Sequence, residues 1–247
     1  MQRFFLQLSY RGAPYCGWQR QPNAPSVQES IEKALSIVLK TSASVTGCGR
    51  TDAGVNASCY YAHFDYAGEI PFGERRSWVY RLNALLDKEI AVHAVFEVPM
   101  DMHARFSAIR RTYRYYLHTE KNPFITHSSY FFPYDFDAGK IRDAGRYLCT
   151  CTDFTSFSKL HTDTKNNLCD LTRADFRYLG NGQWVFVFTA NRFLRNMVRA
   201  LVGTLLGVGT GRYSMADLVS IVEAKDRCKA GVSVPAHALF LDKIVYF

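Results

Sequence analysis

The sequence has 247 residues, of which 48 % are hydrophobic, so it is long enough for two domains of ordinary size and too apolar to be disordered. An excess of 30 basic over 22 acidic residues leaves a net charge of +8, which favours a polyanionic partner, and 15 % aromatic residues add side chains that stack on unpaired bases. Seven cysteines without a C-x-x-C pair indicate reduced thiols in a cytoplasmic protein and argue against a zinc site. We expect no signal peptide before the first predicted strand. The uncharged stretch 200–211 is too short to span a membrane.

The first half of the chain alternates predicted strands and helices. Apolar residues at every second position predict a strand over 3–10. Ser26 and Glu29 have the spacing of a capping box, which predicts a helix whose apolar face begins at Val27. The segments that follow predict, in order, a strand over 59–66, a helix over 78–86 and a strand over 90–98.

A similar order restarts after residue 111. The pattern predicts a strand over 112–118, a helix from an Asp137 cap to 148, a hairpin of strands 171–178 and 184–190, a helix over 192–206 that ends at glycines, a helix capped by Ser214 with Asp217, and a strand over 238–246. This order predicts the α+β class, with two halves that each carry a largely antiparallel sheet and helices on one face. We place the domains at 1–105 and 106–247, with an active-site cleft between them.

The most unusual segment is the glycine-rich loop 47–57. Arg50 and Asp52 lie two residues apart among small neighbours, so a cation stands beside an accessible carboxylate and favours its ionised form. Such a carboxylate can act as a nucleophile or a base. The alternative is an ordinary turn in which Asp52 accepts backbone N–H groups.

Two later segments place basic residues among aromatic or apolar ones. In a strand, Arg110 and Arg114 face one way, and Arg111, Tyr113 and Tyr115 face the other. This suits phosphate contacts and base stacking, although an edge strand with solvated arginines would look the same. In a helix over 192–206, four polar residues form one stripe that is either a solvated face or the wall of a cleft: Arg192, Arg195, Asn196 and Arg199.

Together these segments resemble the TruA family of tRNA pseudouridine synthases along nearly the whole chain. The matching motifs, in order, are Tyr10-Arg11-Gly12 with Gly17-Trp18-Gln19-Arg20-Gln21 and Ser26-Val27-Gln28; Gly49-Arg50-Thr51-Asp52-Ala53-Gly54-Val55; His103-Ala104-Arg105-Phe106-Ser107-Ala108 with 111–115; Asp153-Phe154-Thr155-Ser156-Phe157; Phe193-Leu194 with Met197-Val198-Arg199; and Pro235-Ala236-His237 with Leu239. Six motifs in the right order are a specific signal.

The resemblance implies a role for each matched residue. Asp52 is the catalytic aspartate, Arg50 beside it holds the RNA or the flipped nucleotide, and Tyr113 stacks on the target base. Arg199 pairs with the aspartate, and Leu239 forms an apolar wall of the pocket. The residues expected to contact the RNA are Arg20, Arg111, Arg114, Arg192 and Arg195.

The resemblance also implies two RRM-like, ferredoxin-like halves, a homodimer, and the isomerisation of uridines at positions 38–40 of the tRNA anticodon stem-loop. No cofactor is expected, because the reaction adds and removes nothing, and no metal is expected, because the sequence has no ligand cluster of recognisable spacing. The chain departs from the family pattern at Asn56, where the family has His, at Arg11, where Asp is common, and at Ala238, where Gly is usual.

Two other functions remain open from the residues alone. A tandem RRM-type binding module would carry the aromatic residues but needs no carboxylate beside the arginines. A two-carboxylate glycoside hydrolase would need a second acidic residue across the site, and no matched motif supplies one.

Overall fold

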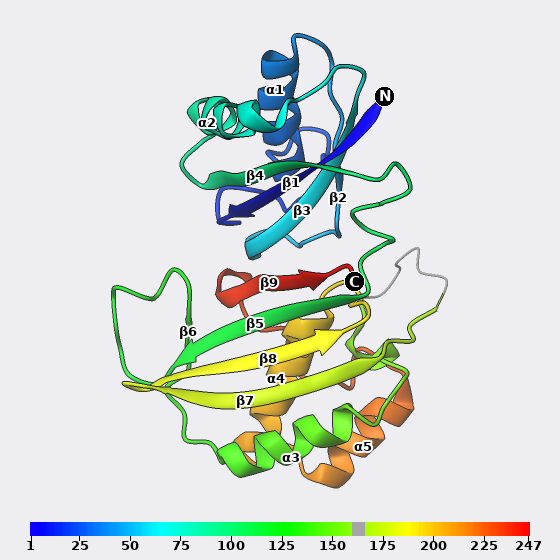
Figure 1. The fold of residues 1–247 in the computed structure, drawn as a ribbon. Coiled ribbons are helices and arrows are strands. Elements are labelled where there is room, and N and C mark those ends of the chain that lie inside the picture. Colours follow the sequence, from blue (N-terminus) through cyan, green and yellow to red (C-terminus); the bar gives the residue numbers. More distant parts are fainter. Residues whose placement is uncertain (160–165) are drawn as a thin grey trace. The chain divides into compact units, whose positions relative to one another are not determined.

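The computed structural model describes residues 1–159 and 166–247, and its course is drawn in Figure 1. The chain forms two compact units. Met1–Ile109 together with Leu241–Phe247 make the first unit, and Arg110–Phe240 make the second. The C-terminal residues therefore return to the first unit after the chain has completed the second.

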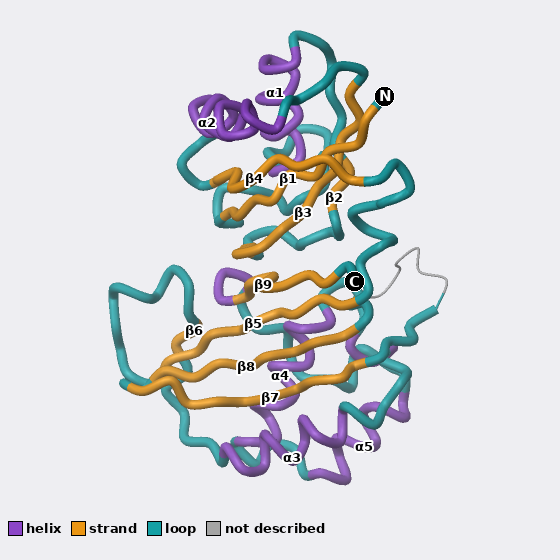
Figure 2. Tube along the Cα trace, in the orientation of Figure 1, coloured by secondary structure: helices purple, strands orange, loops and turns teal. Residues whose placement is uncertain are grey.

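The first unit combines antiparallel strands with two α-helices (Figure 2). Its strands follow the order β4-β1-β3, and the short β2 pairs with β3. The elements are β1 (Gln2–Tyr10), α1 (Val27–Leu39), β2 (Thr46–Gly47), β3 (Asn56–Tyr66), the 3-10 turn η1 (Phe72–Glu74), α2 (Arg75–Leu85) and β4 (Ile90–Val98), and the unit also holds Leu241–Val245 of the final strand β9 (Leu239–Val245).

The predicted helix after Ser26 is confirmed as α1. The Ser26 side chain accepts a hydrogen bond from the Glu29 N–H, which satisfies one of the free donors at the helix start. Its apolar residues fall on one face at helical spacing, and that face is buried: Val27, Ile31, Ala34, Leu35, Val38 and Leu39. The strands predicted over 3–10 and 90–98 are confirmed as β1 and β4.

The second unit follows a comparable order of elements. These are β5 (Arg110–His118), β6 (Tyr130–Phe131), α3 (Ala138–Leu148), the 3-10 turn η2 (Thr155–Phe157), β7 (Leu171–Gly180), β8 (Gln183–Ala190), α4 (Met197–Gly209), α5 (Met215–Ala224) and the 3-10 turn η3 (Ala236–Ala238). Strand β8 lies between β5 and β7 and is antiparallel to both, and α4 runs behind these strands in Figure 1. The α+β class is thus confirmed.

Local signals in the second unit are also confirmed. Asp137 caps α3 through hydrogen bonds from the N–H groups of Gly139 and Lys140. Ser214 and Asp217 form the complete capping box of α5. The hairpin turn between β7 and β8 has positive φ at each of residues 180, 181 and 182, which explains the glycines there.

The prediction of a helix over 192–206 is wrong at both ends. Helix α4 begins at Met197, because Asn196 has a left-handed conformation with φ 66° and lies outside the helix. Arg192 and Arg195 therefore precede the helix, and the predicted stripe of polar residues along it does not exist. The helix also continues through its glycines to Gly209. Gly203 is needed for packing, since a Cβ there would lie 1.9 Å from the Val232 carbonyl oxygen.

Within residues 1–159 and 166–247, none of the helices combines the length and the apolar composition needed to cross a membrane.

Candidate active site

The glycine-rich loop that carries Asp52 lies against the turn that follows β1. The Trp18 N–H donates to the Thr51 carbonyl (3.3 Å), and the Thr51 hydroxyl is 2.8 Å from the Tyr10 hydroxyl. The backbone of this turn approaches the loop closely at Gly17, where an added Cβ would lie 2.4 Å from the Thr51 carbonyl oxygen. Only a residue without a side chain allows this approach.

Both ends of the loop are anchored as well. At the start, the Tyr60 hydroxyl donates to the Gly49 carbonyl. Tyr60 is itself fixed because it is fully buried and its ring stacks on Trp18 with 4.1 Å between centroids. At the end, the buried Asn56 side chain accepts a hydrogen bond from the Gly12 N–H through Oδ1 (2.9 Å). Hydrogen bonds thus anchor the loop at both ends.

Asn56, where the resembling family usually has His, makes a contact within the protein. The Asn56 side chain is 4 % exposed, and it accepts a hydrogen bond from a backbone N–H inside the protein. Asn56 thus links the end of the loop to the turn after β1. This contact gives the Asn56 side chain a structural role in the loop.

Asp52 lies in the middle of this anchored loop and is partly exposed. Its backbone carbonyl accepts a hydrogen bond from the Val55 N–H (3.1 Å), and Gly54 has φ 77°, so residues 52–55 form a tight turn. Arg50, two residues earlier, donates from Nε to Gln19 Oε1 (3.4 Å). The loop therefore carries a carboxylate and a guanidinium on a rigid backbone that is reachable from solvent.

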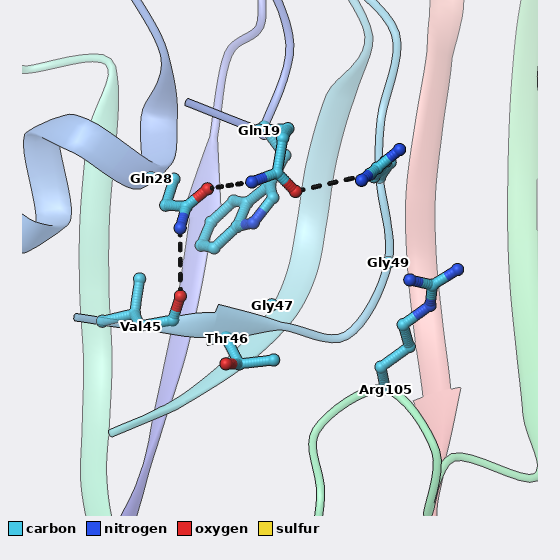
Figure 3. Close-up of a pocket in the computed structure, with 9 residues that line it drawn as sticks. Gln19, Gln28, Val45, Thr46, Gly47, Gly49 and Arg105 are labelled. Atoms are coloured by element: carbon cyan, nitrogen blue, oxygen red, sulfur yellow. Dashed lines mark hydrogen bonds between the residues drawn. The ribbon is translucent and has the colours of Figure 1, made fainter. Parts of the chain in front are cut away.

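A pocket of about 130 Å³ lies beside the start of this loop (Figure 3). Its side chains come from segments far apart in the sequence: Trp18, Gln19, Gln28, Val45, Thr46, Gly47, Gly49, Arg50 and Arg105. Figure 3 shows Gln19 with a hydrogen bond to Gln28 on one side and to the arginine of the loop on the other. Two arginines are the only charged residues of this lining.

In the second unit, the expected base-stacking tyrosine lies on the central part of β5. Tyr113 is 9 % exposed, and its ring meets Phe193 edge to face at 5.0 Å. Arg199 on the first turn of α4 donates from Nε to the Val234 carbonyl (2.6 Å). Leu239, at the start of β9, is buried.

Tyr115, which the strand pattern predicts on the same face of β5 as Tyr113, joins this cluster. Its hydroxyl donates to the Pro235 carbonyl (3.0 Å), next to the carbonyl that Arg199 contacts. Burial raises the pKa of Tyr115, and the nearby charge of Arg199 acts in the opposite direction. The 234–235 segment thus places Tyr115 and Arg199 on neighbouring carbonyls.

The arginines expected to bind RNA differ in how they are held. Arg20 is exposed and pairs with Glu32 (3.7 Å). Arg111 donates from Nη1 to the Asn191 carbonyl (3.0 Å), while Arg114 is exposed on β5. Arg192 donates from Nη1 to Asn166 Oδ1 (3.4 Å), and Arg195 is exposed in the turn before α4.

Comparison with known proteins identifies the family. A family model described as tRNA pseudouridine synthase matches residues 147–246. A protein of Porphyromonas gingivalis named tRNA pseudouridine synthase A is 49 % identical over 247 residues, which cover 100 % of this chain and 98 % of that protein. Proteins of the same name from Parabacteroides distasonis and Bacillus subtilis are 49 % and 39 % identical, over 100 % and 99 % of this chain and 96 % and 99 % of their own length.

The chain belongs to the tRNA pseudouridine synthase A family. The resemblance drawn from the six sequence motifs is thereby confirmed, and it extends over the whole chain. In this member of the family, Asp52 and Arg50 lie on the same loop of the first unit. The structure also brings Tyr115 and Arg199 together in the second unit.

Sequence reasoning missed two residues of the pocket beside the Asp52 loop. Gln28 and Arg105 occur in the family motifs, but nothing in their spacing indicated that both line a pocket with Arg50. In the part of the chain that the structure describes, no group of three or more His, Cys, Asp or Glu side chains could hold a metal ion.

Proposed function

We propose that this chain isomerises uridine to pseudouridine at positions 38–40 in the anticodon stem-loop of tRNA, with Asp52 as the nucleophile. The observation that carries the proposal is the match of the whole chain to relatives named tRNA pseudouridine synthase A, at up to 49 % identity. The anchored loop supports the role of Asp52, because it presents a carboxylate that solvent can reach on a backbone held at both ends.

The reaction suits a carboxylate without a cofactor. The bond between ribose C1′ and uracil N1 breaks, the base turns, and a new bond forms between C1′ and C5. The C5 proton is lost and N1 gains a proton, so substrate and product are isomers and no oxidant or energy source is consumed. A covalent route needs a nucleophile that can also leave, and Asp52 as a carboxylate meets both conditions.

The remaining residues are proposed to prepare the nucleotide. A base inside a stem is out of reach, so the target must be flipped into the site. Tyr113 would then stack on it, which offsets roughly 1–3 kcal/mol per base of lost stacking. Arg199 would balance the charge of Asp52, and Leu239 would close the apolar side of the pocket. The exposed arginines Arg114 and Arg195 would contact phosphates.

We propose further that the two units correspond to RRM-like halves, with the catalytic loop on an N-terminal domain of residues 1–105 and the site completed by residues 106–247. The order of strand, helix, two strands, helix and strand in the first unit supports this, as does its strand order β4-β1-β3-β2. We also propose that the protein is a homodimer and that it acts in the cytoplasm. All seven cysteines are free, as expected in a compartment where thiols stay reduced.

The test replaces Asp52 with asparagine. The amide is nearly isosteric, so the loop keeps its shape, but it cannot serve as an anionic nucleophile. Asp52→Asn should abolish release of the uridine C5 hydrogen from tRNA while binding stays within about tenfold of wild type, or roughly 1.4 kcal/mol. Asp101→Asn, at an exposed carboxylate elsewhere in the first unit, is the matched control and should retain full activity.

Each result has a defined meaning. Substantial C5 hydrogen release by Asp52→Asn would remove Asp52 from the mechanism. A wild-type protein that binds tRNA but releases no C5 hydrogen from any tRNA would instead favour a non-catalytic RNA-binding module.

A further inference from the structure

The pocket beside the catalytic loop presents hydrogen-bond donors and positive charge. Arg50 and Arg105 are its charged residues, and its lining contains no Asp or Glu. A guanidinium group only donates hydrogen bonds, and its fork matches the oxygens of a phosphate. The pocket therefore suits a ligand that is an anion and offers only acceptors.

Arg50 is held in an orientation that leaves its fork available. Its Nε donates to Gln19 Oε1 (3.4 Å), and Gln19 in turn donates from Nε2 to Gln28 Oε1 (2.9 Å). This chain of contacts is the one drawn in Figure 3. Among the described residues, the hydrogen bond to Gln19 is the one that Arg50 makes, so both of its Nη atoms remain for a ligand.

Gln28 anchors this arrangement to α1 and cannot itself read a base. Its Oε1 also accepts from the Arg20 N–H (3.0 Å), and its Nε2 donates to Glu32 Oε1 (3.0 Å) and to the Val45 carbonyl (3.1 Å). Its hydrogen-bonding capacity is therefore used within the protein. Gln28 therefore has no donor or acceptor left for a ligand, and the guanidinium groups are the pocket's charged donors.

Arg105 enters the pocket from a turn that is also fixed. The N–H groups of Arg105 and Phe106 donate to His103 Nδ1 (3.0 and 3.2 Å). The neighbouring Ala104 is fully buried, donates to His63 Nδ1 (3.1 Å) and accepts from the Tyr246 hydroxyl (2.7 Å). The position of the Arg105 side chain thus rests on a backbone that three side chains hold.

We infer that this pocket binds a backbone phosphate of the RNA through Arg50 and Arg105. Arg50 is two residues from Asp52, so their Cα atoms lie within about 7 Å of each other. The pocket borders the loop that carries Asp52, so a phosphate in it belongs to the stretch of RNA bound beside that loop. This inference rests on the proposed function and adds to it a site for the sugar–phosphate backbone.

The test compares Arg105→Gln, Arg105→Lys and Arg76→Gln. Arg76 is an exposed arginine on α2 outside the pocket, so its variant loses the same charge elsewhere in the first unit. Dissociation constants for tRNA are measured at several salt concentrations. Loss of one phosphate contact should lower the slope of log K against log salt by roughly 0.7–0.9.

We expect Arg105→Gln to show that smaller slope and about tenfold weaker binding, the effect of losing one charge-assisted contact. Arg105→Lys should keep the slope and lose less affinity, and Arg76→Gln should resemble wild type. Equal thermal midpoints would show that all variants fold.

An unchanged slope and affinity in Arg105→Gln, or an equal loss in Arg76→Gln, would overturn the inference. C5 hydrogen release by the wild type is measured first, so that the two proposals fail separately. Without that release the proposed function fails, whereas an active wild type with an unaffected Arg105→Gln variant refutes the phosphate pocket alone.

Discussion

Gly17→Ala probes whether the catalytic loop depends on close packing against the turn after β1. Gly17 has φ 93°, a region that an alanine occupies at a cost of about 1–2 kcal/mol. The added Cβ would also lie 2.4 Å from the Thr51 carbonyl oxygen and 3.2 Å from the Asp52 carbonyl carbon. Both neighbours are backbone atoms, so the clash is relieved only by moving the loop, at about 1–3 kcal/mol.

The two costs together lower the free energy of unfolding by about 2–5 kcal/mol. For a chain of this length the thermal midpoint should fall by roughly 4–20 °C. The same displacement moves Asp52, and a shift of about 1 Å at a reacting group can reduce turnover on the order of a hundredfold. Thermal unfolding and single-turnover C5 hydrogen release measure the two effects separately.

Gly49→Ala is the matched control for stability. Gly49 lies in the same loop, but a Cβ there would meet nothing within 4 Å, and its φ is not positive. Its free energy of unfolding should stay within about 1 kcal/mol of wild type. If Gly17→Ala were as stable as Gly49→Ala and turned over at the wild-type rate, close docking of the loop would not be what positions Asp52.

Two further outcomes follow from the structure. Arg199→Met keeps much of the side-chain volume but removes the charge and the hydrogen bond to the Val234 carbonyl. It should therefore reduce the single-turnover rate much more than the affinity for tRNA. A large loss of affinity with a normal rate would make Arg199 a phosphate contact instead. His63 is 6 % exposed, and burial, with the charge of Arg3, lowers its pKa to about 4. Because the unfolded chain binds the proton first, near pH 6.5, the stability due to neutral His63 is present above that pH and is lost by roughly 3 kcal/mol as pH falls to 4. In His63→Gln the free energy of unfolding should change less over that range, and an unchanged pH profile would refute this assignment.

Much of the candidate site could be predicted because its motifs are local. Asp52 and Arg50 stand in one short loop, and their chemistry depends on residue types at fixed spacing. The family was also predictable, since six motifs occur in the same order as in its members. The roles of Tyr113, Arg199 and Leu239 came with that resemblance, and they remain proposals for the experiments above.

The pocket could not be predicted, because its residues come from segments that only folding brings together. Gln19 lies after β1, Gln28 on α1 and Arg105 in the turn before β5, and no periodicity links them. The start of α4 was missed for a similar reason. The apolar residues before Asn196 continue a helical pattern, but the left-handed backbone of Asn196 and its hydrogen bond to Ser233 (2.6 Å) end that pattern.

The sequence by itself determined the elements whose signals lie within one segment. The capping residues Ser26, Asp137 and Ser214 start helices, and the apolar face of α1 is buried as its spacing requires, because these interactions join residues a few positions apart. Tertiary structure alone decided how the Asp52 loop is anchored. Its anchors Gly12, Gly17 and Tyr60 act through close backbone approach and buried hydrogen bonds between distant segments, and such contacts leave no periodic trace in the sequence.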